Sequence, residues 1–179
     1  MISAQQVEYL FLDCFYGSHR TRLLGGAAEP LYAPATGPGD AIIHYREDFA
    51  ASALHEIAHW CVAGPGRLQQ EDYGYWYSPD GRSAQQQRAF EKVEVVPQAI
   101  EWHFALACGL PFRVSADNLS QTDSDGGSDF ARAVLQQARQ FCEQALPQRA
   151  LLFRAVLASY CERIEPPCVE QFQLQDRAA

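Results

Sequence analysis

The chain has 179 residues and a formal net charge of −8 at pH 7, with 47% hydrophobic and 20% charged residues. This length suits one domain with a sizeable core, and we expect residues 1–179 to form a single domain. The acidic balance disfavours a general nucleic-acid binder, and no apolar run is long enough to span a membrane.

The first half of the chain alternates between helical and strand-like patterns. A capping-box pattern that begins at Ser3 predicts an amphipathic helix over about residues 4–16. Residues 25–40 are rich in Gly and Pro, so we expect an irregular excursion there, with a short strand at 31–32. Residues 41–45 are β-prone and predict a further strand.

The second half is predominantly helical. The pattern predicts one helix over 84–108, which Pro97 should kink or break because proline lacks a backbone donor. Two further amphipathic helices are expected at about 129–145 and 148–164. Together these elements predict an α+β fold that is mainly helical and contains a small sheet.

A His-Glu-x-x-His motif lies between these halves. His55 and His59 are four residues apart, so on a helix they share one face and can bind one metal ion through their imidazoles. The intervening Glu56 completes the helix motif of zinc peptidases. The surrounding residues are apolar, which predicts a helix within the core, with Asp48 as its N-cap. Unpartnered imidazoles would be costly in such a place, and the motif therefore predicts a metal site.

Such a site normally takes a third protein ligand. We expect Glu94 in this position, because Gln98 follows four residues later and could orient a metal-bound histidine. Glu91 is the first alternative ligand and Glu101 the second.

The ligand types leave two chemistries open. With zinc, Glu56 would act as the general base of a metallopeptidase. With ferrous iron, two histidines and a carboxylate leave positions for O₂ and substrate, as in oxygenases. The residues alone favour the zinc hydrolase, and a structural metal site in a non-enzymatic module is the third interpretation.

Several segments resemble the elongation factor P hydroxylase family. The longest are residues 49–64, 72–82 and 90–99, and the shorter segments 29–35 and 116–119 are also similar. The combination of these segments is far more specific than the metal motif alone.

The resemblance implies a bacterial cytoplasmic hydroxylase with a core similar to that of His-Glu-x-x-His peptidases. It would add oxygen to the lysyl-lysine modification of elongation factor P, using O₂ and non-haem Fe(II), with zinc as an alternative metal in the purified protein. The implied iron ligands are His55, His59 and Glu94.

The resemblance also bears on the substrate. Glu56 would no longer act as a peptidase base but would support the metal site or donate a proton. Candidates for the substrate pocket are Tyr75, Trp76 and Asp80. The expected partners are O₂ and elongation factor P carrying a lysylated lysine, with no nucleic acid or membrane involved.

Overall fold

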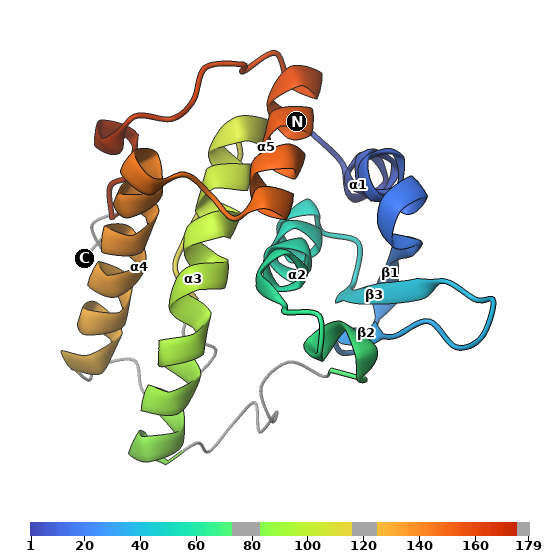
Figure 1. The fold of residues 1–179 in the computed structure, drawn as a ribbon. Coiled ribbons are helices and arrows are strands. Elements are labelled where there is room, and N and C mark those ends of the chain that lie inside the picture. Colours follow the sequence, from blue (N-terminus) through green and yellow to red (C-terminus); the bar gives the residue numbers. More distant parts are fainter. Residues whose placement is uncertain (73–82, 116–124, 175–179) are drawn as a thin grey trace.

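The computed structural model of the chain describes residues 1–72, 83–115 and 125–174. These residues form five α-helices, two short 3₁₀ helices and one three-stranded sheet (Figure 1). The α-helices are α1 (Ala4–His19), α2 (Ala50–Val62), α3 (Ala84–Cys108), α4 (Asp125–Gln144) and α5 (Gln148–Tyr160). The strands are β1 (Thr21–Ala27), β2 (Leu31–Ala33) and β3 (Ala41–Arg46), and the 3₁₀ helices are η1 (Arg67–Gln69) and η2 (Val169–Gln171). The predicted mainly helical α+β fold with a small sheet is confirmed.

The sheet has the order β1-β3-β2, with β3 parallel to β1 and antiparallel to β2. β1 was not predicted, because its glycines suggested irregular structure. Gly25 is required by close packing, since a Cβ atom there would lie 2.6 Å from the Tyr45 hydroxyl. The carboxylate of Glu8 accepts hydrogen bonds from the Gly25 amide and the Tyr45 hydroxyl, both at 2.9 Å. A strand interrupted by glycine therefore pairs with β3 and is anchored to α1.

The helix that carries the His-Glu-x-x-His motif, α2, is central to the fold. It packs against α1, α3, α5 and β3, and Figure 1 shows it between the sheet and the other long helices. Its buried residues are Ala53, Leu54, Ile57, Ala58, Trp60 and Cys61. Because so much of α2 is enclosed, the histidines of the motif are held on a well-packed helix.

The two ends of α2 are held differently. The N-cap is Phe49, without a side-chain hydrogen bond, so the predicted Asp48 cap is wrong. The Asp48 carboxylate instead lies beside Gly25 of β1. At the other end, the Arg149 guanidinium of α5 donates hydrogen bonds to the carbonyls of Cys61 and Ala63. These bonds satisfy carbonyls that the helix end leaves unpaired.

The 25-residue helix α3 faces α2 on one side and α4 on the other. It begins with a capping box at Ser83 and continues through Pro97, so proline does not break the helix. Pro97 is buried, and the contacts of α3 with α2, α4 and α5 outweigh the loss of one backbone donor. α4 starts four residues before the predicted start, and α5 ends four residues before the predicted end.

Among the helices of residues 1–72, 83–115 and 125–174, none combines the length and apolar character needed to cross a bilayer.

Candidate metal centre and the adjoining pocket

Three side chains from two helices converge at the centre of the molecule. His55 and His59 project from one face of α2, and their Nε2 atoms are 3.1 Å apart. Glu94 reaches them from α3, with Oε1 at 3.1 Å from His59 Nε2 and Oε2 at 3.6 Å from His55 Nε2. The three residues could hold a metal ion, because one ligand atom from each lies within 4.8 Å of the others.

The spacing fits a small transition-metal ion. Ligand atoms that bind one ion at about 2.0–2.2 Å, with angles of about 90–110° between them, lie about 2.9–3.6 Å apart. The two Nε2 atoms are 3.1 Å apart, and each lies 3.1–3.6 Å from one of the two Glu94 oxygens, Oε1 for His59 and Oε2 for His55. Two imidazoles and one carboxylate suit iron or zinc, and a three-ligand set leaves coordination positions for other molecules.

Glu101, one of the two alternative ligands, contacts the far side of a histidine. Its Oε2 lies 2.8 Å from His55 Nδ1. Because an ionised carboxylate can only accept, Nδ1 carries the proton and Nε2 keeps its lone pair for the metal. Glu101 therefore orients His55 and is not part of the three-residue group.

Gln98 was expected to orient a histidine, but it contacts Glu94. Its Nε2 donates to Glu94 Oε2 at 3.3 Å and to the Ser115 carbonyl at 2.7 Å. The Ser115 amide returns a bond to Gln98 Oε1 at 3.1 Å, which fixes the orientation of the Gln98 amide. The buried Gln98 thus presents an N–H group to the buried Glu94 carboxylate.

The other alternative ligand, Glu91, has a different neighbour. Its Oε1 accepts a hydrogen bond from Gln87 Nε2 at 3.0 Å, one turn earlier on α3. Glu91 is not in the group that could bind metal. Of the three acidic residues considered, Glu94 is the one that α3 directs to both histidines.

Burial and charge together perturb the ionisable groups of the centre. Burial alone lowers the pKa of His55, but Glu101, with its hydrogen bond, and then Glu94 and Glu56 raise it to about 10. Burial would raise the pKa of Glu94, but His59 and His55 lower it to about 2. Without metal, the centre therefore keeps the His55 imidazole in its positively charged form and Glu94 ionised. A metal ion would have to displace the proton on Nε2 of His55.

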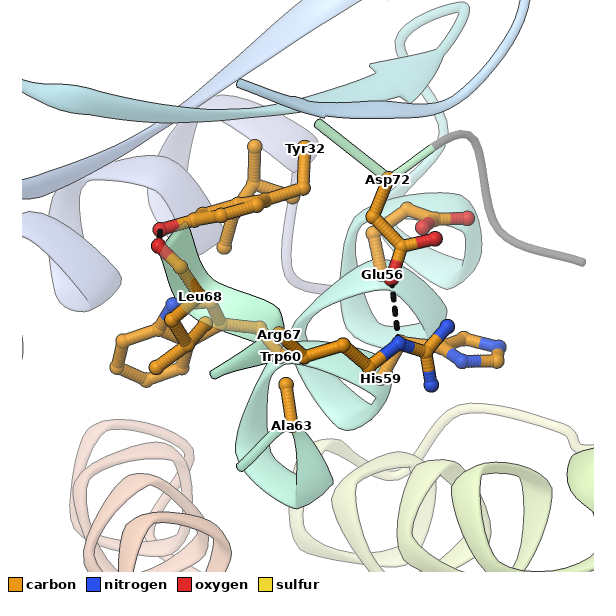
Figure 2. Close-up of a pocket in the computed structure, with 9 residues that line it drawn as sticks. Tyr32, Glu56, His59, Trp60, Ala63, Arg67, Leu68 and Asp72 are labelled. Atoms are coloured by element: carbon orange, nitrogen blue, oxygen red, sulfur yellow. Dashed lines mark hydrogen bonds and ion pairs between the residues drawn. The ribbon is translucent and has the colours of Figure 1, made fainter. Parts of the chain in front are cut away.

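A hollow of about 450 Å³, partly open to solvent, adjoins the centre (Figure 2). It is lined by Tyr32, Ile43, Glu56, His59, Trp60, Ala63, Arg67, Leu68 and Asp72. His59 belongs to both the hollow and the metal group. Glu56 also faces this hollow, and burial raises the pKa of its carboxyl group. A molecule in the hollow would therefore lie beside the metal centre and beside a carboxyl group that tends to retain its proton.

An ion pair and a backbone bridge define one wall of this hollow. Arg67 Nε lies 2.6 Å from Asp72 Oδ2, as Figure 2 shows. The backbone of Asp72 is fixed to β2 by two hydrogen bonds with Tyr32, of 2.8 and 3.0 Å. Tyr32, Arg67 and Asp72 were not predicted to be site residues. No chemical motif marks them, although Tyr32 and Asp72 lie in segments that resemble the hydroxylase family.

The remaining candidates are placed as follows. Tyr75, Trp76 and Asp80 lie outside the described residues. His103 is buried on α3, and its Nε2 donates to the Ala138 carbonyl of α4 at 2.9 Å, so it is not one of the metal-binding candidates.

Comparison with known proteins identifies the family. A sequence model of the elongation factor P hydroxylase family matches residues 10–172, a range that contains every candidate residue discussed above. The chain is 48% identical over 158 residues to the elongation factor P lysine hydroxylase of Haemophilus influenzae. That alignment covers 87% of this chain and 88% of the relative. Neither match supports the zinc metallopeptidase interpretation. The chain belongs to the elongation factor P hydroxylase family.

Proposed function

We propose that this chain hydroxylates the lysyl-lysine modification of elongation factor P, using O₂ and a non-haem Fe(II) ion held by His55, His59 and Glu94. The observation that carries the proposal is the convergence of two imidazoles and one carboxylate in a chain of this family. The protein would be an oxidoreductase of the monooxygenase type, formed by one domain over residues 1–179. Because its substrate takes part in translation, it would work in the cytoplasm.

Bound iron would supply the redox chemistry that activates O₂. One oxygen atom enters a C–H bond of the substrate and the other leaves as water, so an external reductant must supply two electrons together with two protons. Zinc would fill the same ligand set in purified protein without supporting this reaction, since it has no redox chemistry.

The chain's own residues orient the ligands and handle protons. Glu101 holds the proton of His55 on Nδ1, which keeps Nε2 directed at the metal. Gln98 donates to Glu94 and limits the rotation of its carboxylate. Glu56, whose carboxyl pKa is raised by burial, lies beside the hollow and would hold a proton there. Tyr75, Trp76 and Asp80 remain proposed substrate contacts.

The direct test is the intact mass of elongation factor P from cells with and without this protein. We expect a difference equal to the mass of one oxygen atom, restored by the wild-type chain but not by a His55→Ala/His59→Ala double variant. A Glu91→Ala variant is the matched control, because it changes a nearby α3 carboxylate that contacts Gln87. Equal masses in all strains would reject the proposal.

Metal analysis distinguishes this proposal from the peptidase. After anaerobic purification, we expect iron in one-to-one proportion with the chain. Stoichiometric zinc, together with peptide cleavage that Glu56→Gln abolishes, would establish the hydrolase instead.

A further inference from the structure

The hollow beside the metal group has two chemically different sides. In Figure 2 the aromatic and aliphatic side chains of Tyr32, Trp60 and Leu68 lie toward one side. The ionisable side chains Glu56, His59, Arg67 and Asp72 lie toward the other. A ligand that suits this hollow has an apolar body and a polar end. A lysine side chain has this character, since four methylene groups carry an ammonium group.

The charged side contains a carboxylate that already binds a cation. Asp72 Oδ2 is 2.6 Å from Arg67 Nε, a separation typical of a strong charge-assisted contact. Among the described residues that line the hollow, Asp72 supplies a carboxylate that would suit a cationic ligand.

The two partners of this ion pair differ in how firmly they are held. Asp72 is bridged to β2 through both backbone hydrogen bonds with Tyr32, and its side chain is 23% exposed. Arg67 begins the three-residue helix η1, directly after Gly66, and its side chain is 45% exposed. The carboxylate is thus the better anchored partner. The guanidinium, on a long side chain, can turn toward solvent without any change in the strands.

We propose that Asp72 binds an ammonium group of the substrate's lysyl-lysine side chain, in exchange for Arg67. This assignment rests on the proposed function, because it takes a lysine-derived side chain as the substrate. The alkyl part would pack against Tyr32, Trp60 and Leu68, and Arg67 would move outward as the ammonium group enters. Arg67 thereby acts as an internal competitor that holds the carboxylate when no substrate is bound.

The exchange predicts effects of opposite sign for two substitutions in one ion pair. Dissociation constants should be measured without O₂, with the metal-loaded protein and elongation factor P that carries the lysyl-lysine modification. Asp72→Asn should raise the dissociation constant by about tenfold to hundredfold, because it removes a charge-assisted contact. Arg67→Gln should lower it by about twofold to fivefold, because it removes a partly exposed competitor. The Arg20–Asp40 pair, 3.1 Å apart and not among the lining residues, supplies the control Asp40→Asn, which should have no effect.

A second ligand separates recognition of charge from recognition of shape. Elongation factor P with its lysyl amines acetylated should bind wild type and Asp72→Asn with equal, weak affinity. A merely structural ion pair predicts instead that Arg67→Gln and Asp72→Asn weaken binding alike, and that result would overturn the assignment. An unchanged dissociation constant in Asp72→Asn would do the same. If Asp72→Asn proves misfolded, Arg67→Gln still tests the exchange, because the proposal requires this variant to bind elongation factor P more tightly than wild type. Failure of the wild-type chain to bind or hydroxylate elongation factor P would instead reject the proposed function.

Discussion

Glu101 accepts a hydrogen bond from His55 Nδ1 at 2.8 Å, on the side of the imidazole ring opposite Nε2, which faces His59 and Glu94. The contact joins α3 to α2 across 46 residues of sequence. Metal-binding histidines are commonly held in this way, because the second ring nitrogen fixes both the tautomer and the direction of the lone pair. The two helices therefore share two acidic contacts at the centre, one from Glu94 and one from Glu101.

Replacing Glu101 should weaken metal binding without abolishing it. We expect Glu101→Ala to reduce the affinity for Fe(II) or Zn(II) by about tenfold to hundredfold, the usual effect of losing a residue that orients a ligand. Glu101→Gln should retain most of the affinity, because its amide oxygen can still accept from Nδ1. Competition with a chromophoric chelator measures these affinities. Equal affinities in wild type and Glu101→Ala would show that His55 needs no such partner.

Replacing Glu94 should have a larger effect. Glu94→Ala removes the carboxylate that lies 3.1 Å from His59 Nε2, and we expect the purified variant to retain no metal. Glu91→Ala should retain metal like wild type, since Glu91 contacts Gln87. Metal content after gel filtration measures both. The reverse result would make Glu91 the third ligand.

Gln98 should contribute to stability as well as to metal binding. Gln98→Ala removes two hydrogen bonds of the Gln98 side chain, one accepted from the Ser115 backbone amide and one donated to the buried Glu94 carboxylate. We expect the free energy of unfolding to fall by about 1–3 kcal/mol. Urea denaturation of the metal-free protein measures this loss. Gln140, whose amide contacts the exposed Gln144 on α4, provides the control Gln140→Ala, for which we expect little change.

His103 should make the fold sensitive to mild acid. Burial, which has the largest effect, and Arg154 lower its pKa, the hydrogen bond to the Ala138 carbonyl raises it, and the net pKa is about 4. The folded chain therefore keeps His103 neutral at pH values where the unfolded chain, with a pKa near 6.5, protonates it. Stability is fully present above pH 6.5 and falls as the pH drops toward 4. Between pH 6.5 and 5 the loss should be about 2 kcal/mol.

The comparison with His103→Gln isolates this contribution. The glutamine side chain keeps a donor for the Ala138 carbonyl but does not titrate. Other groups contribute almost equally to both proteins, so the difference between their two pH profiles reports His103. In this interval the folded chain keeps His55 protonated and Glu94 ionised, so neither group changes its charge in the folded state. Parallel profiles would mean that the pKa of His103 is the same in the folded and the unfolded chain.

The parts of the site that could be predicted are those within single helices. The spacing of His55 and His59 on α2, and the position of Glu94 one turn before Gln98 on α3, follow from helical periodicity. Helical periodicity does not predict which residue each of these side chains contacts. Glu101 rather than Gln98 contacts a histidine because of the way α3 lies across α2, which depends on packing that no local pattern encodes.

The missed elements have similar causes. β1 contains Gly25 where the Tyr45 side chain comes close, and the same glycine makes the segment look irregular in sequence. The Arg67–Asp72 pair lies after α2 in a stretch with little periodicity, and the bridge between Tyr32 and Asp72 connects it to β2. Both β1 and the Arg67–Asp72 pair depend on contacts between short segments that are distant in the sequence.

The three-residue group also bears on the stability of the fold. Its side chains come from two helices, α2 and α3, which residues 63–83 connect in the sequence. An ion bound by all three residues would link α2 to α3. Its binding would stabilise the folded chain, and its loss would destabilise it. The thermal stability of the chain would then follow its metal content. If the ion is iron, as proposed above, cells short of iron would contain a chain that is not only inactive but also easier to unfold and degrade.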